Sequence, residues 1–303
     1  MTNFNYYHNN TSHGDLPVIA VNERLNDPSR YLPSQGLMNA VNVALHLQQP
    51  LLLTGEPGTG KTQLAHHIAD FFNLGDALVF NAQTTSQAKD LFYRYDALTH
   101  FQWANTQKDL LSLDEVERRF IRYEGLGAAI RHNKKSVVLL DEIDKAPRDL
   151  PNDILAAIEK LQFDVPEIGK TFAATNNNRP IIIMTSNSEK NLPDAFLRRV
   201  VYYHIPFPDA ATLLRILHSK VGGYVDSDLK LLIQHFEAIR KLKLRKSPAT
   251  AELINWVALL HKIGFDAKKL NDPDSITKKD KELLELSYTV LAKNRDDLRE
   301  MMK

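Results

Sequence analysis

The sequence predicts an α/β domain with a parallel sheet, followed by a small helical domain. Between residues 18 and 207, five short apolar runs alternate with helical patterns. These runs are rich in Val, Ile, Leu or Phe, and most lack polar alternation, which suits strands buried on both faces of a parallel sheet. After Pro206 and Pro208, apolar residues recur at intervals of three and four, as they do in amphipathic helices.

The elements follow in a regular order along the chain. The expected strands are Pro50–Thr54, Leu78–Asn81, Ser136–Asp141, Pro180–Ser186 and Val200–Ile205. The helices expected between them include Thr62–Phe72, Asp149–Leu161 and Asp194–Arg199. Later helices are expected at Asp209–Lys220, Ser227–Lys243 and Thr250–Ile263, with one more helix in Asp272–Lys303. Strands alternating with helices are typical of α/β domains.

The same patterns divide the chain into three parts. Residues 1–16 are polar and rich in Asn and His, so we expect a flexible N-terminal tail. Residues 17–207 form the predicted α/β core, with insertions at about 84–132 and 163–175. The second insertion resembles a hairpin whose arms meet near Pro166–Gly169. Residues 208–303 form the predicted helical lid and C-terminal helix.

Composition favours a soluble protein of the cytoplasm. Apolar residues make up 43% and charged residues 25% of the 303 residues, as in ordinary globular proteins. The net charge of +1 gives no overall attraction to nucleic acid or to an anionic membrane. The absence of cysteine excludes disulfides and thiolate metal sites. No apolar run approaches the length of a membrane span, and the N-terminus lacks the pattern of a signal peptide.

A phosphate-binding loop follows the first expected strand. The segment matches G-x-x-x-x-G-K-[ST] in full and continues into an expected helix; it reads Gly55, Glu56, Pro57, Gly58, Thr59, Gly60, Lys61, Thr62 and then Gln63. Gly58 and Gly60 allow backbone N–H groups to turn inward around phosphates. The helix N-terminus attracts the same anion, and Lys61 adds a positive charge. The Thr62 hydroxyl is expected to bind Mg²⁺.

Two acids follow the expected strand Ser136–Asp141. Asp141 is expected to hold Mg²⁺, and Glu142 to act as the general base that polarises the attacking water. The alternative interpretation is an ordinary solvated acidic turn, which the phosphate loop upstream disfavours. Asp144, in the same turn, is interpreted as a helix-entry or surface acid.

Three further polar residues could act on the γ-phosphate. Asn187 directly follows the expected strand Pro180–Ser186 and could hydrogen-bond the γ-phosphate or the attacking water; the alternative is a turn Asn. Arg198 and Arg199 lie at a helix-to-strand corner, where an arginine could reach the γ-phosphate of a neighbouring subunit. Arg199 is the better candidate, and the alternative is that both are solvated surface charges.

Several segments together resemble the MoxR branch of the AAA+ ATPases. They read LLLTGEPGTGKT, RYDAL at Arg94–Leu98, VVLLDEIDKA, IIIMTSN and LPDAFLRR, and the resemblance covers about residues 30–265. It implies a P-loop NTPase core with a helical lid, ATP between the two, and a ring, expected to be hexameric. It also implies a chaperone-like remodelling activity, often beside a partner with a von Willebrand A domain.

One position departs from the family pattern. Members of the family carry an arginine near the start of the third lid helix that contacts the γ-phosphate. The matching positions here hold Ala249 or Ala251, and Arg245 or Lys246 could replace that arginine.

Three functions remain open from the sequence. The first is a Mg²⁺-dependent ATPase that remodels or activates a protein partner. The second is a nucleotide-gated assembly scaffold with little turnover, which the departure in the lid favours and the intact Glu142 disfavours. The third is a nucleic-acid-associated NTPase motor, which the near-neutral charge and the lack of a basic, aromatic stripe disfavour.

Overall fold

The computed structural model consists of two compact units, each described here by itself. It describes residue 24 and residues 27–106, 111–132, 134–147, 150–188, 192–272 and 276–303. The core unit comprises residues 33–55 and 61–205, and the lid unit comprises residues 1–32, 56–60 and 206–303. The flexible tail expected at residues 1–16 lies outside the described residues.

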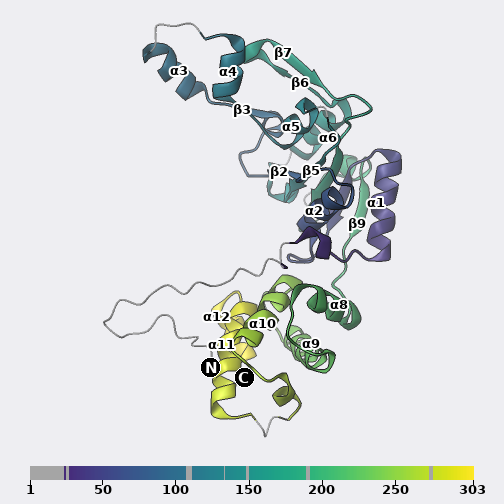
Figure 1. The fold of residues 1–303 in the computed structure, drawn as a ribbon, viewed down its shortest axis with the longest axis vertical. Coiled ribbons are helices and arrows are strands. Elements are labelled where there is room, and N and C mark those ends of the chain that lie inside the picture. The colour runs from purple at the N-terminus through teal and green to yellow at the C-terminus, as the bar shows by residue number, and fades with distance from the viewer. Residues whose placement is uncertain are drawn as a thin grey trace. The chain divides into compact units, whose positions relative to one another are not determined.

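A five-stranded parallel sheet forms the centre of the core unit (Figure 1). Its strands, in spatial order, are β2 (Leu78–Asn81), β5 (Val137–Asp141), β8 (Ile181–Thr185), β1 (Leu51–Thr54) and β9 (Val201–His204). Every neighbouring pair runs parallel. The predicted fold class is therefore confirmed, and all five expected strands form with bounds that differ by a residue or less at each end.

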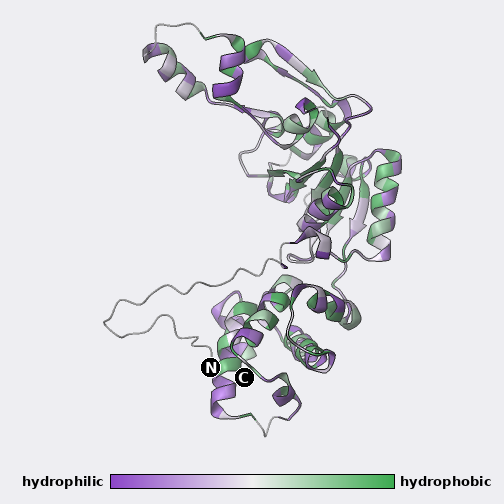
Figure 2. Cartoon of the chain, viewed as in Figure 1, coloured by the Kyte–Doolittle hydropathy of each residue, from purple (hydrophilic) through white to green (hydrophobic). Residues whose placement is uncertain are grey.

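The sheet forms because its strands consist mostly of apolar side chains, which gain free energy when they are buried. The strand β1 is 0–1% exposed along its length, and Val137 to Leu140 of β5 are 0% exposed. Figure 2 shows these central strands mostly in the hydrophobic colour. Burying each such side chain contributes about 1.5–3 kcal/mol. The polar residues Thr54, Asp141 and Thr185 come at the carboxyl ends of the three inner strands.

Helices cover the sheet and lead the chain to and from the site. Helix α1 (Gln35–Leu47) packs on β1 and β9, and its N-cap Ser34 accepts a hydrogen bond from the Leu37 amide. Helix α2 (Lys61–Phe71) packs on β5 and β8. The shorter helices of the core unit are α5 (Gly125–Arg131), α6 (Leu150–Lys160) and α7 (Asp194–Leu197).

Both expected insertions contain secondary structure of their own. The first contains η3 (Ala88–Leu91), β3 (Tyr93–Tyr95), α3 (Ala97–Thr106), α4 (Leu113–Phe120) and β4 (Ile121–Tyr123), followed by α5. The second is an antiparallel hairpin of β6 (Gln162–Val165) and β7 (Lys170–Ala173), joined by η5 (Pro166–Ile168). The hairpin and the helices α3 and α4 lie at the same end of the core unit in Figure 1.

The lid unit is helical, as expected. Its elements are η2 (Pro28–Arg30), α8 (Ala210–Lys220), α9 (Asp226–Arg240), α10 (Thr250–Lys262), η7 (Ala267–Asn271), α11 (Lys278–Leu291) and α12 (Arg295–Met301). The last stretch forms two helices where one was expected. Asn294 starts the second helix because its side chain accepts a hydrogen bond from the Asp297 amide.

The lid has its own apolar core. Leu217, Phe236, Trp256 and Leu291 are all 0% exposed. The indole of Trp256 donates a hydrogen bond of 2.8 Å to Ser287 Oγ, so this buried polar group is satisfied. Among the described residues, no helix combines the length and apolarity that crossing a membrane requires.

Candidate nucleotide-binding site

The loop between β1 and α2 adopts a backbone that requires glycine. Gly58 has φ of +77° and Gly60 has φ of +88°, conformations that residues with a Cβ rarely adopt. A Cβ on Gly60 would also lie 2.9 Å from a ring carbon of Tyr31. Within the described chain, the amides of Gly58 and Gly60 donate no hydrogen bond. This loop can therefore offer amides to an anion.

Lys61 brings a cation to the start of helix α2. Its side chain is largely buried, and Nζ donates to Gly55 O at 2.8 Å and to Asn187 Oδ1 at 3.0 Å. Burial lowers the pKa of Lys61, while the nearby charges of Asp141, Asp144 and Glu142 oppose that shift. An incoming phosphate would stabilise the charged form further.

Asp141 lies at the carboxyl end of β5, opposite Thr62. Thr62 Oγ1 donates to Asp141 Oδ1 at 3.1 Å and to Oδ2 at 3.2 Å. Thr185, at the end of the neighbouring strand β8, also donates its hydroxyl to Asp141 Oδ1. Thr62 and Asp141 supply the hard oxygen donors that Mg²⁺ prefers, so the residues fit the expected metal.

Glu142 follows Asp141 in a left-handed backbone conformation, with φ of +55°. Its amide donates to Thr185 Oγ1 at 2.9 Å, so Thr185 contacts both acidic residues. The Glu142 carboxylate accepts a hydrogen bond from Lys145, and this bond raises the pKa of the Lys145 ammonium. Thr185 is not among the site residues predicted from the sequence, although a polar residue that ends an apolar strand is a visible signal.

The Asn187 side chain accepts a hydrogen bond from Lys61, and the Asn187 backbone forms a second contact in the core unit. The Asn187 amide donates to Asp144 Oδ1 at 3.2 Å. Asp144, interpreted from sequence as a helix-entry or surface acid, therefore supports the loop after β8. Both side chains belong to the core unit.

The other residues of the predicted phosphate loop have structural contacts. Thr59 donates through both its amide and its hydroxyl to Glu56 O, at 3.4 and 2.8 Å, which closes the turn around Pro57. Gln63 lies in the first turn of α2 and is partly exposed.

The two corner arginines remain at the surface of the core unit. Arg199 Nη1 lies 3.5 Å from Glu159 Oε1, with both side chains more than half exposed. Arg198 ends helix α7 and is also exposed. Among the described residues, neither arginine contacts Asp141 or Glu142. Their predicted role toward a neighbouring subunit remains a prediction.

The lid unit has small residues where the family carries an arginine. A Cβ on Gly58, which belongs to this unit, would lie 3.2 Å from the Cβ atoms of both Ala249 and Ala251. Of the two suggested substitutes, Arg245 pairs with Asp296 at 2.9 Å, and Lys246 donates its backbone amide to Asp297.

A lid arginine that the sequence analysis did not consider contacts the loop. Arg240 Nη2 donates to Glu56 Oε2 at 3.0 Å, and both residues belong to the lid unit. The guanidinium carbon of Arg240 lies 3.6 Å from the ring centroid of Phe207. The position of Arg240 in the last turn of α9 does not predict its contact with Glu56.

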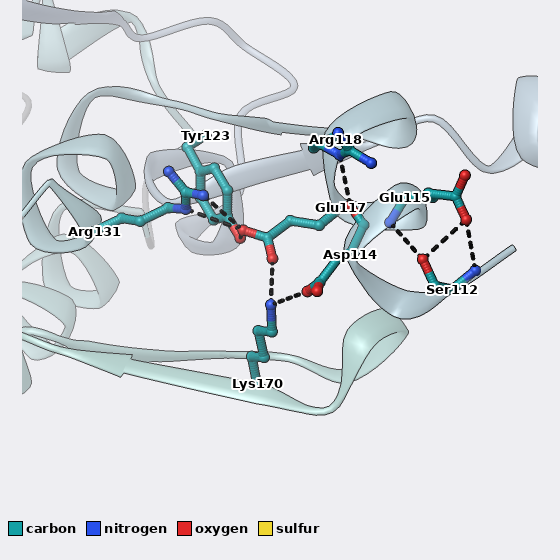
Figure 3. A network of polar contacts seen from close by, with 8 residues as sticks. All are labelled: Ser112, Asp114, Glu115, Glu117, Arg118, Tyr123, Arg131 and Lys170. Atoms are coloured by element: carbon teal, nitrogen blue, oxygen red, sulfur yellow. Dashed lines mark hydrogen bonds and ion pairs between the residues drawn. The ribbon is translucent and has the colours of Figure 1, made fainter.

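A second polar network joins the two insertions (Figure 3). Glu117 of α4 is 6% exposed and accepts hydrogen bonds from Lys170 at 2.7 Å, Tyr123 at 2.9 Å and Arg131 at 3.0 Å. Burial opposes ionisation, but these donors together lower the pKa of Glu117. Lys170 also contacts Asp114 at 2.8 Å. The hairpin is thereby tied to helix α4.

Comparison with known proteins supports a nucleotide-binding site. Residues 50–200 match the family model of the AAA domain, dynein-related subfamily. A 140-residue segment is 31% identical to chaperone protein ClpB 1 of Nostoc sp. and covers 45% of this chain but 13% of that protein.

Two solved structures show distant likeness. NtrX from Brucella abortus in complex with ADP is 18% identical, with a TM-score of 0.48, over 90% of this chain and 60% of that one. A single-substitution variant of RuvB from Thermotoga maritima is 15% identical, with a TM-score of 0.43, over 84% of this chain and 74% of that one. At these scores, neither structure informs the details of the site.

The fold, the site geometry and the match over residues 50–200 together support a nucleotide-binding P-loop protein of the AAA+ ATPase class. The MoxR branch within that class stays a prediction.

Proposed function

We propose that this protein is a Mg²⁺-dependent ATPase that assembles into a ring and couples ATP hydrolysis to the remodelling or activation of a protein partner. One observation carries the nucleotide part of this proposal: Lys61 contacts Asn187, and Thr62 contacts Asp141, at the carboxyl edge of the sheet. The coupling and the ring are inferred from the AAA-domain match.

Each residue has a defined task in this proposal. The Gly58 and Gly60 amides and the Lys61 ammonium bind the phosphates. Thr62 and Asp141 would hold Mg²⁺, which supplies charge neutralisation when bound. Glu142 takes a proton from the attacking water, and Asn187 orients that water or the γ-phosphate.

Phosphate release in the presence of ATP and Mg²⁺ tests this function. We expect turnover in the wild type and a loss of about 10²–10⁴-fold in Glu142→Gln, because the general base is gone. Binding of Mg·ATP should persist in Glu142→Gln. The matched control is Glu282→Gln, an exposed glutamate of α11, which should hydrolyse ATP normally. Wild-type protein with no more turnover than Glu142→Gln would refute hydrolysis.

The same assays separate the alternatives. A nucleotide-gated scaffold would assemble with ATP and with a non-hydrolysable analogue while turning over almost no ATP. A nucleic-acid motor would bind DNA or RNA at physiological salt, with strong salt dependence. A preference for GTP in the phosphate-release assay would correct the choice of nucleotide. A partner with a von Willebrand A domain would be retained by Glu142→Gln in the presence of ATP.

A further inference from the structure

We propose that the core unit carries a second ligand site, which binds a small apolar carboxylate. The site is a cavity of about 370 Å³ at the amino ends of β1 and β8. Small-molecule sites commonly span about 300–1,000 Å³, so the cavity is large enough for a short acyl chain. The residues of the nucleotide site follow the carboxyl ends of the same strands, at the opposite edge of the sheet.

The interior of this cavity is apolar. Five lining side chains belong to the core and are no more than 6% exposed, and all are apolar: Ala44, Leu51, Ile158, Ile182 and Ile183. Its walls include Val41 and Leu45 of α1, together with Phe72 and Leu74 after α2. Each methylene group that enters such a cavity favours binding by about fourfold. An alkyl chain therefore suits the cavity better than a polar body.

The rim of the cavity is polar and positively charged. Among the residues that the structure describes, five polar side chains line it: Gln48, Gln49, Lys135, Asn176 and Arg179. None of the described lining residues is acidic, so among them the two cations give the rim a net positive charge. Within the described part of the chain, none of the five side chains forms a hydrogen bond or an ion pair.

These unused donors identify the head group. A carboxylate matches the planar fork of an arginine, and an ammonium or amide adjacent to it can donate to the same oxygens. Arg179, Lys135 and the rim amides line the same cavity as the buried apolar side chains. The occupant therefore has an apolar chain and one carboxylate head.

Calorimetry on the full chain with sodium octanoate and 1-octanol tests the proposal. We expect octanoate to bind at least tenfold more tightly than the neutral alcohol, because only octanoate uses the rim cations. Lys135→Gln and Arg179→Gln should each weaken octanoate binding about tenfold and leave octanol binding unchanged. The matched control is Lys134→Gln, which neutralises an adjacent exposed lysine outside the cavity.

A second variant addresses the cavity itself. Leu45→Trp fills the space from α1 without altering the rim, so it should weaken both ligands, and circular dichroism verifies that each variant folds. The proposal is overturned if octanoate does not bind at millimolar concentration, or if octanol binds as tightly. It is also overturned if the rim substitutions or Leu45→Trp leave octanoate binding unchanged, or if Lys134→Gln weakens it equally. None of these readouts depends on ATP turnover.

Discussion

At the scale of single residues, Thr185 contacts both acidic residues of the candidate site, Asp141 through its carboxylate and Glu142 through its backbone amide. It is 1% exposed, donates its hydroxyl to Asp141 and accepts a hydrogen bond from the Glu142 amide. The strand β8 holds Thr185 rigidly, because β8 lies between β5 and β1. Thr185 is therefore placed to position Asp141, the proposed metal ligand, and Glu142, the proposed general base.

Thr185→Val keeps the shape of the side chain and removes the hydroxyl. We expect Mg²⁺ affinity or turnover to fall about 10–100-fold, the range typical when a hydrogen-bond partner of a metal ligand is lost. Phosphate release measured across a Mg²⁺ titration checks this. The control is Thr171→Val on the exposed hairpin strand β7, which should behave as wild type. Equal effects of the two substitutions would show that Thr185 has no positioning role.

At the scale of elements, Glu117 ties the hairpin β6–β7 to α4 and α5. Its carboxylate is buried, and its three donors come from β7, β4 and α5. Removing the charge leaves these donors with a weaker acceptor, which is costly where water is excluded. Asp114 contacts the same Lys170 but is 78% exposed, so its ion pair stabilises much less.

Glu117→Gln should therefore lower the free energy of unfolding by about 1–3 kcal/mol. Amide hydrogen exchange should accelerate in the hairpin and in α4, while the central sheet stays protected. Asp114→Asn is the matched control and should have a much smaller effect. Equal exchange in the two variants would contradict a stabilising role for the buried carboxylate.

The lid unit contains a buried histidine, and this burial makes the stability of the lid unit depend on pH. His235 stacks against Trp256 and Tyr288, each with ring centroids 5.9 Å away, and its Nε2 lies 2.8 Å from the Tyr288 hydroxyl. Burial lowers the pKa of His235 below 6.5. The unfolded chain then binds more protons below pH 6.5, so stability is lost as pH falls below that value.

Denaturation of the lid monitored by Trp256 fluorescence checks this, in a Trp103→Phe background. Between about pH 7.5 and 5.5, the unfolding midpoint should fall, and His235→Gln should reduce that fall because the residue no longer titrates. An unchanged pH dependence in His235→Gln would assign the effect to other groups.

The sequence predicts those features of the fold and the site that depend on residues close together in the chain. The apolar runs, the glycine spacing of the phosphate loop and the acids after β5 are all contiguous, and the structure has five parallel strands where they were expected. Thr185 lies 44 residues from Asp141, and Lys170 lies 53 residues from Glu117. Such contacts depend on how the chain folds, so no local pattern predicts which residues meet. The last stretch of the chain forms two helices, α11 and α12, because Asn294 caps the start of α12.

At the scale of the whole molecule, the proposed ring requires Arg199 to act on a neighbouring subunit. Lys61→Met and Arg199→Ala proteins should each be nearly inactive alone. Mixed in equal amounts, they should regain about a quarter of the wild-type rate, because some interfaces then combine an intact Lys61 with an intact Arg199. Phosphate release from the mixture measures this. A rate equal to the average of the separate proteins would contradict action between subunits.

The proposed function requires that Mg·ATP bind at the site formed by Lys61, Thr62 and Asp141. Titration calorimetry of the full chain with Mg·ATP measures this binding without requiring turnover or assembly. We expect one site per chain and at least tenfold weaker binding of Mg·ATP in Lys61→Met, while Lys160→Met binds as wild type. No heat of binding, or equal affinity in Lys61→Met and the wild type, would contradict it.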